Sequence, residues 1–189
     1  MKVLYATSEF APLIKTGGLA DVSGSLPLAL TRLGVDARVL LPAYPAVLRQ
    51  LGGNVASQKP LAAIAAHREL PRAQLLGATG PHGLPLLLLH CPELYDRPGN
   101  PYLGPDGRDW PDNDLRFGLF SRVAALLGTG ASPIDWRPDV VHCQDWQCGL
   151  APVYLSHGLG EGSMAAGRAA SVMTIHNLAY QGIFPAGGH

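Results

Sequence analysis

The chain has 189 residues, of which 47% are hydrophobic and 15% charged, a composition that supports one α/β domain with a buried core and argues against extensive disorder. Its 14 basic residues balance 14 acidic ones, so no long-range charge attracts nucleic acid or an anionic membrane. No hydrophobic run approaches the roughly 20 residues of a membrane span and no secretory signal opens the chain, so we expect a cytoplasmic protein with reduced thiols at Cys91, Cys143 and Cys148.

The first elements follow the order strand, loop, helix and strand. Residues 3–7 form a short apolar run, and a polar loop that contains two glycines follows over 8–18. Hydrophobic residues at steps of three and four then predict a helix that ends at Gly34. The hydrophobic positions of this helix are Leu19, Val22, Leu26, Leu30 and Leu33. A second apolar run at 36–41 completes a βαβ unit, and such units build parallel sheets.

The middle of the chain gives weaker signals. Residues 46–85 contain short apolar runs broken by glycine and proline, and they favour no single element. The segment 84–90 is typical of a buried strand. The loop 91–111 is rich in proline, glycine, aspartate and aromatic residues, and so long a loop inside a compact domain is usually functional or disordered.

A second helix and another strand follow this loop. Helical spacing over 115–127 predicts the helix, and Asp112 and Asn113 are expected to cap its start. Residues 139–142 are then expected to form a buried strand.

The last part of the chain repeats the alternation of helix and strand. The pattern predicts a helix over 146–156 with Leu150 and Val153 pointing inward. A linker rich in glycine, alanine and serine follows over 158–170, and 171–175 is the last expected strand.

Three polar clusters follow expected strands, at residues 8–21, 142–147 and 176–182. In open α/β sheets, ligands bind beyond the carboxyl ends of the strands. We therefore expect the three clusters to line one cleft.

In the first cluster, Lys15 precedes Thr16 and the pair Gly17 and Gly18, and a helix begins at once. Glycines let a ligand approach the backbone, the start of a helix offers free N–H groups, and a lysine suits a phosphate oxygen. The segment matches neither the Walker A nor the Gly-x-Gly-x-x-Gly pattern. The alternative interpretation is a tight turn with a surface lysine.

The other two clusters are ambiguous by themselves. Asp145 can orient a hydroxyl or stabilise positive charge, or it can simply cap a helix. His142 with the nearby cysteines lacks the paired spacing of a zinc site, so we predict no metal. His176 and Asn177 can form hydrogen bonds with sugar hydroxyls, and Tyr180 can stack on a sugar face.

Taken together, the motifs resemble those of the bacterial glycogen synthases and plant starch synthases, nearly from end to end. The matching residues are Ser8, Glu9 and Pro12, the run from Lys15 through Asp21 to Val22, the segment 36–42, the loop 94–99, Asp112 and Asn113 with Arg116 and Phe117, the segment 137–142, and 176–182.

This resemblance implies the Rossmann-like N-terminal half of a GT-B glycosyltransferase. Family members transfer glucose from ADP-glucose to the non-reducing end of α-1,4-glucan in glycogen biosynthesis, with retention of configuration and without a metal or other cofactor. The resemblance assigns catalytic roles to Asp21, Asp145 and His176. It assigns contacts with the nucleotide-sugar to Lys15, Thr16, Gly17, Gly18 and Asn177. It places Tyr95, Trp146 and Tyr180 where the acceptor glucan binds.

The sequence departs from the family in two places. Gln144 and Gln147 stand where the family typically has histidines, and the chain ends at His189, soon after the third cluster. We expect residues 1–189 to be the acceptor-side domain without the C-terminal nucleotide-binding domain, and to be inactive alone. The alternative is a non-catalytic glucan-binding module, and a GT-B transferase with a small acceptor is a third reading. The preference for ADP over UDP rests on the resemblance alone.

Overall fold

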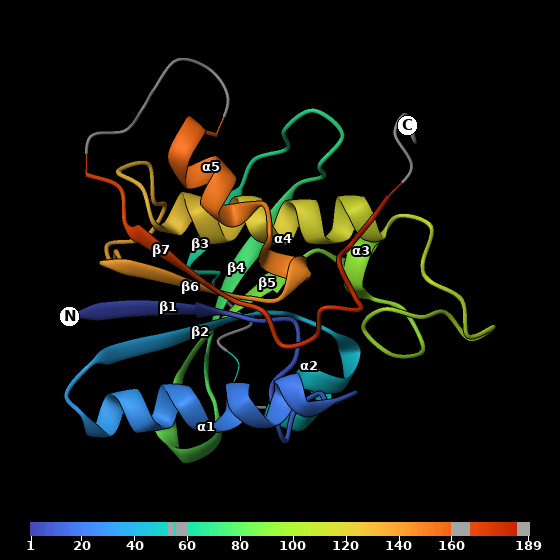
Figure 1. The fold of residues 1–189 in the computed structure, drawn as a ribbon, viewed down its shortest axis with the longest axis horizontal. Helices are drawn as coiled ribbons and strands as arrows, with labels where there is room; N and C mark the ends of the chain where they lie inside the picture. Colours follow the sequence, from blue (N-terminus) through green and yellow to red (C-terminus); the bar gives the residue numbers. More distant parts are fainter. Residues whose placement is uncertain (53–54, 56–59, 160–166, 185–189) are drawn as a thin grey trace.

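The computed structural model describes residues 1–52, 55, 60–159 and 167–184, which form one sheet with helices on both faces (Figure 1). The predicted linker 158–170 falls mostly on 160–166, outside the described residues. Within the described part of the chain, no helix is long and apolar enough to cross a membrane.

The sheet has the strand order β3-β4-β5-β2-β1-β6-β7. Five neighbouring strands are parallel: β1 (Lys2–Ala6), β2 (Asp36–Pro42), β5 (Pro85–His90), β6 (Val140–Gln144) and β7 (Ala170–Thr174). At the β5 edge, β4 (Ala73–Thr79) and β3 (Ala62–Ile64) continue the sheet in antiparallel pairing. The chain builds outward from β1 first through β2 and later through β6, so the topological switch point lies between β1 and β6. The predicted Rossmann-like, mostly parallel sheet is confirmed.

Helices cover both faces of this sheet (Figure 1). One face carries α1 (Gly18–Arg32) and α2 (Pro45–Leu51), and the other carries α4 (Asn113–Leu127) and α5 (Ala151–His157). The described residues also form three short helical segments: η2 (Pro81–Gly83), α3 (Pro92–Tyr95) and η3 (Trp146–Cys148).

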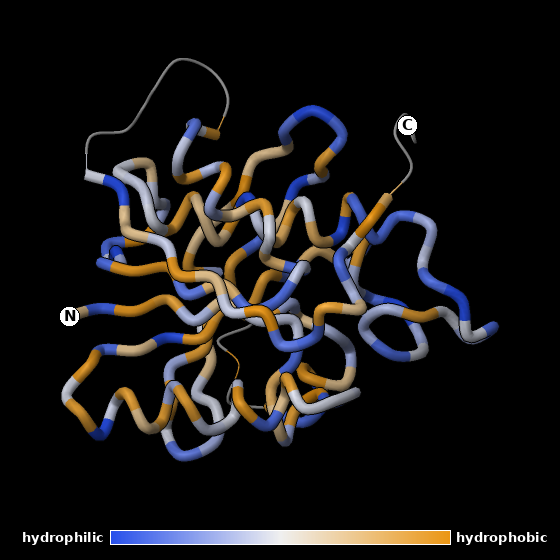
Figure 2. Tube along the Cα trace, in the orientation of Figure 1, coloured by the Kyte–Doolittle hydropathy of each residue, from blue (hydrophilic) through white to orange (hydrophobic). Residues whose placement is uncertain are grey.

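The core lies between the sheet and both helix layers. Strands covered on both faces need continuous apolar runs, and the central strands supply them. Leu4, Leu40, Leu88 and Val141 are fully buried in β1, β2, β5 and β6. Figure 2 shows this concentration of hydrophobic residues along the central strands.

The predicted helix over 146–156 is wrong in its continuity and its inward face. The segment forms η3, a break around Gly149, and then α5. Pro152 lies in the first turn of α5, where its missing N–H costs nothing, so the helix begins anew there. The new register buries Ala151 and Leu155, whereas Leu150 and Val153 are 47% and 50% exposed.

The first helix is confirmed over almost the predicted range, but its most buried positions differ from the hydrophobic stripe. Ala20, Ser23 and Pro27 are buried, whereas Val22 and Leu33 are exposed. Asp112 does precede α4 as predicted, yet its side chain makes no capping hydrogen bond. Its carboxylate binds the Arg97 guanidinium instead, at 2.6 Å on both oxygens.

Candidate functional site: a cleft at the switch point

Residues of all three polar clusters line one cleft of about 850 Å³ beyond the carboxyl ends of β1, β6 and β7. The predicted site residues that line it are Thr16, Gly17, Gly18, Asp145, Trp146, His176, Asn177 and Tyr180. This is the position that the switch-point rule gives for ligands. The expected convergence of the three clusters is therefore confirmed, whereas the role of each residue stays a prediction.

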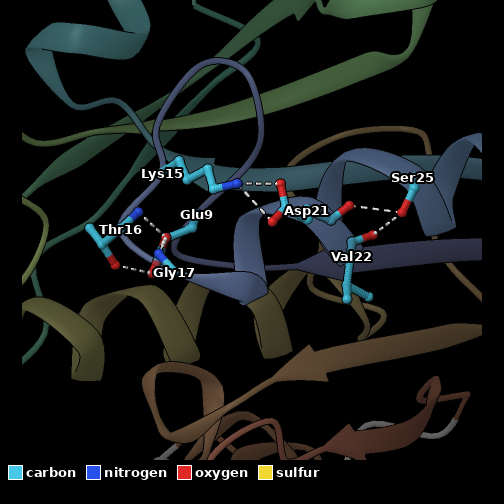
Figure 3. A network of polar contacts seen from close by, with 7 residues as sticks. All are labelled: Glu9, Lys15, Thr16, Gly17, Asp21, Val22 and Ser25. Atoms are coloured by element: carbon cyan, nitrogen blue, oxygen red, sulfur yellow. Dashed lines mark hydrogen bonds and ion pairs between the residues drawn. The ribbon is translucent and has the colours of Figure 1, made fainter.

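The glycine loop, residues 15–18, contributes Thr16, Gly17 and Gly18 to the first wall of the cleft. Figure 3 shows the contacts of this loop. Gly17 has an extended backbone and precedes α1 without a side-chain capping bond. A Cβ atom added to Gly17 or Gly18 would meet no other atom within 4 Å. Neither glycine is therefore required by crowding within the chain, and the open space beside them is available to a ligand.

Lys15 and Asp21 lie beside this wall and do not line the cleft. The Lys15 ammonium donates to both Asp21 carboxylate oxygens, at 2.7 and 2.8 Å, and the two side chains are 52% and 58% exposed. Exposed ion pairs contribute only about 0–1 kcal/mol, so an incoming phosphate can compete with Asp21 for the ammonium.

The turn after β6 forms the second wall and carries Asp145 in a strained conformation. Its φ of 56° and ψ of −175° lie in a region that is essentially reserved for glycine and costs about 1–3 kcal/mol. Hydrogen bonds hold it there, since the Asp145 N–H donates to the Thr174 carbonyl at 2.9 Å and the Asp145 carboxylate accepts the His176 N–H at 2.8 Å. Strain maintained in this way is typical of functional sites.

The third wall is the segment after β7, where His176 is half-buried. Its Nε2 lies 2.8 Å from Oε1 of Gln144, a fully buried residue. An amide oxygen can only accept, so the His176 ring donates from Nε2 in this bond. Gln144 thus performs a definite task in this chain, that of fixing the His176 ring.

Aromatic rings form the floor between these walls. The Trp146 ring contacts Phe117 edge-on with centroids 4.9 Å apart, and Phe184 and Tyr102 lie 5.8 and 6.3 Å from it. Gly182 has a φ of +62°, and a Cβ there would lie 2.5 Å from a Trp146 ring atom. Only glycine therefore lets the segment after β7 pass so close to Trp146.

The charge of the cleft is negative. Glu9, Asp109 and Asp145 contribute carboxylates, and the described residues that line the cleft include no lysine or arginine. Such a lining stabilises positive charge that develops on a bound ligand.

Tyr95, a predicted acceptor contact, and His142, which the sequence brought up only as a metal ligand, also lie outside the cleft. Tyr95 is 1% exposed in the core, and its hydroxyl donates to the Arg116 carbonyl at 2.7 Å, so it offers no open ring face for an acceptor sugar. It borders a separate cavity of about 470 Å³ that Tyr44 also lines. His142 is half-buried beneath the cleft, with Nε2 2.7 Å from the Thr174 hydroxyl. Burial and the nearby charge of His176 lower its pKa.

The three cysteines are buried thiols. Burial raises the pKa of Cys143 to about 12 and also raises the pKa values of Cys91 and Cys148, so all three stay protonated at neutral pH. Among the described residues, no three His, Cys, Asp or Glu side chains gather as a metal site would require. The expected absence of a metal stays a prediction.

Sequence reasoning missed Glu9 and Tyr102 as site residues. Both line the cleft, and the Tyr102 hydroxyl donates to the Glu9 carboxylate at 2.6 Å across 93 residues of sequence. The signal for Glu9 was a charge placed directly after a buried strand. Nothing in the sequence pairs Tyr102 with it.

Comparison with known proteins assigns the family. The model described as "Starch synthase catalytic domain" matches residues 2–189. The chain belongs to the starch synthase catalytic domain family. It is 57% identical over 185 residues to the "Glycogen synthase" of Dechloromonas aromatica (strain RCB) and 50% identical over 188 residues to that of Nitrosospira multiformis, in each case over 97% of this chain. The chain spans only 36% of the length of these two relatives.

A solved structure is similar in fold as well as sequence. It is the "Catalytic domain of Starch Synthase IV from Arabidopsis thaliana bound to ADP and acarbose", with a TM-score of 0.66 and 28% identity. The similarity covers 95% of this chain and 34% of the Arabidopsis chain. The family that this chain matches is a glycosyltransferase family.

Proposed function

We propose that the chain is the acceptor-side, sugar-binding domain of a cytoplasmic GT-B glycogen synthase, which transfers glucose from ADP-glucose to the non-reducing end of α-1,4-glucan with retention of configuration. The observation that carries this proposal is the carboxylate-lined cleft at the switch point, where a strained turn fixes Asp145 beside His176. Domain 1–189 supplies one side of the active site, and the remainder of the enzyme supplies the nucleotide-binding side.

The charges of the cleft suit the sugar end of the donor. When the anomeric bond of a nucleotide-sugar breaks, positive charge develops on the glucosyl ring and negative charge on the departing diphosphate. Carboxylates fixed in advance near the ring stabilise the first of these charges without reorganisation. Asp145 fits this role because its backbone and one carboxylate oxygen are already held in place.

The diphosphate end needs positive partners, and this domain offers few. Lys15 stands at the start of the glycine loop, and α1 begins next to open space at Gly18. Exchange of the Lys15 ammonium from Asp21 to a phosphate oxygen would bring one charge to the diphosphate. The other cations come, in this proposal, from the part of the enzyme outside these residues.

The acceptor glucan is expected along the aromatic side of the cleft. Tyr180 is 69% exposed and Trp146 borders the same space, so both offer surface against which glucose rings can stack. The ADP and acarbose bound to the Arabidopsis relative support a nucleotide and an α-glucan-like ligand for this family. They leave ADP-glucose itself as part of the proposal.

The test is a glucosyl-transfer assay on a hybrid enzyme. Residues 1–189 are joined to the complementary part of the Dechloromonas aromatica glycogen synthase, and transfer from labelled ADP-glucose or UDP-glucose to glycogen is measured. We expect transfer with ADP-glucose by the hybrid and none by the 189-residue chain alone. A hybrid that unfolds cooperatively, binds maltooligosaccharide and transfers no glucose would contradict the proposal and favour the glucan-binding alternative.

A further inference from the structure

Glu9 is a buried carboxylate for which the proposed reaction has no direct use. It is 3% exposed, and no lysine or arginine of the described chain forms a salt bridge with it, since the nearby Lys15 is bound to Asp21. A buried charge is costly unless hydrogen bonds satisfy it. The arrangement around this carboxylate therefore calls for an explanation.

Four donors satisfy the carboxylate, and they come from two distant segments. Figure 3 shows the donors from Thr16 and Gly17. One oxygen accepts the backbone N–H groups of Thr16 and Gly17, at 2.5 and 3.2 Å. The other accepts the hydroxyls of Thr16 and Tyr102, at 2.7 and 2.6 Å. Glu9 thus joins the end of β1, the glycine loop and the long loop before α4.

The glycine loop has few other attachments at this point. A Cβ atom added to Gly17 or Gly18 would meet no atom within 4 Å apart from their chain neighbours and the backbone of α1, and α1 has no side-chain cap. The loop would therefore sample many conformations without Glu9, because glycine is the least restricted residue. By taking the two N–H groups before the helix, Glu9 fixes the loop and leaves the first N–H groups of α1 for a ligand.

Tyr102 extends this link to the aromatic side of the cleft. Its hydroxyl lies 2.8 Å from Ser8 as well as contacting Glu9, and its ring packs near Phe117 and Trp146. Burial and the Glu9 charge raise its pKa, so the hydroxyl remains a donor at neutral pH. The Glu9 carboxylate therefore connects the glycine loop, where the donor is proposed to bind, with the aromatic side of the cleft, where the acceptor glucan is proposed to bind.

We propose that Glu9 is a positioning residue that holds the glycine loop in its donor-binding conformation and couples it, through Tyr102, to the glucan side of the cleft. This inference rests on the proposed function for its kinetic part. The claim that Glu9 orders the glycine loop does not depend on that function.

The structural part is tested on the 189-residue chain by amide hydrogen exchange. In Glu9→Ala, the Thr16 and Gly17 amides should exchange about tenfold faster or more, the effect of losing a hydrogen bond to a charged group. The β1 amides should keep their protection and serve as the internal control. Unchanged exchange at Thr16 and Gly17 would overturn the inference, whatever the enzymatic activity.

The kinetic part is tested in the hybrid enzyme. Glu9→Ala should raise the KM for ADP-glucose about tenfold or more. Glu9→Gln should stay within about threefold of the unsubstituted hybrid, because its amide oxygen can accept both backbone N–H groups while the two hydroxyls turn to accept from its NH₂. A merely structural Glu9 would lower the amount of active enzyme, and hence the apparent kcat, with KM unchanged.

Tyr102→Phe provides a milder variant should Glu9→Ala fail to fold. It removes one of the four bonds and should raise the donor KM about threefold. Tyr44→Phe is the matched control, because the buried Tyr44 hydroxyl has no hydrogen-bond partner among the described residues and lies outside the cleft. An equal KM for the Tyr102→Phe and Tyr44→Phe variants would contradict the coupling. An inactive but folded unsubstituted hybrid would count against the proposed function, and leave the exchange result to decide the role of Glu9.

Discussion

The glycine loop and the turn after β6 both follow strands at the switch point and line the same cleft, yet they are built in opposite ways. The glycine loop is open and exposed, with its lysine bound to Asp21 and its backbone tied to the Glu9 carboxylate. The turn after β6 is buried and strained, and Asp145 is 8% exposed. One wall is thus suited to adjusting around a ligand, and the other to holding a charge in place.

This difference separates two kinds of contribution to catalysis. A fixed charge acts on the transition state, because its environment is already organised when the charge on the sugar develops. An adjustable loop contributes mainly to binding. Substitutions in the turn after β6 should therefore change kcat, and those in the glycine loop should change KM.

The largest effect is expected at Asp145. In the hybrid enzyme, Asp145→Asn should lower kcat about 10²–10³-fold, because it removes the negative charge that the proposed function places beside the reacting sugar. The asparagine oxygen can still accept the His176 N–H, so thermal unfolding should change little. A kcat within threefold of the unsubstituted hybrid would remove Asp145 from the catalytic machinery.

Gly18 should give the next largest effect. Gly18→Ala places a methyl group in the empty space beside the loop, and it should raise the donor KM about tenfold or more with no loss of thermal stability. Gly24→Ala in the same helix is the matched control. Its methyl would meet the Ala11 carbonyl oxygen at 2.8 Å, so it should lower the melting temperature and leave the KM unaltered. An unchanged donor KM in Gly18→Ala together with a raised donor KM in Gly24→Ala would show that the donor does not use the space beside Gly18.

Lys15→Ala should raise the donor KM about tenfold, the value of one charge-assisted hydrogen bond, with a negligible change in stability because its ion pair is exposed. Arg32→Ala, at the exposed far end of α1, controls for the loss of a surface cation. Equal donor kinetics in the Lys15 and Arg32 variants would mean that the ammonium never leaves Asp21.

The smallest effect concerns pH and His142. Burial, followed by the charge of His176, lowers the pKa of this ring, so the folded state favours the neutral form. The unfolded chain binds the proton with an ordinary pKa near 6.5, so this contribution to stability is complete above about pH 6.5 and declines as the pH falls through the folded value. Melting temperatures between pH 8 and pH 5 should fall less steeply in His142→Gln. If the melting temperatures of the two proteins fall equally steeply with pH, the lowered pKa of His142 is contradicted.

The strands and the cleft were predictable because their signals are local. Apolar runs mark β1, β2, β5 and β6, and polar clusters at strand ends identify the switch point through topology alone. The antiparallel strands β3 and β4 were not predictable, because short apolar runs between glycine and proline fit several elements.

Details that depend on partners distant in sequence were also out of reach. The restart of the helix at Ala151 exposed Leu150 and Val153 against expectation, and Tyr95 proved to be a core residue. The link from Glu9 to Tyr102 joins residues whose chemistry is unremarkable in isolation. Only the folded chain brings such pairs together.

The most direct test of the central claim is a crystal structure of the hybrid enzyme with ADP and acarbose. We expect the sugar ring nearest the nucleotide to lie within hydrogen-bond distance of Asp145 and His176, with the diphosphate against residues 15–18. A sugar bound instead in the separate cavity beside Tyr44 and Tyr95, with the cleft at the switch point empty, would contradict it.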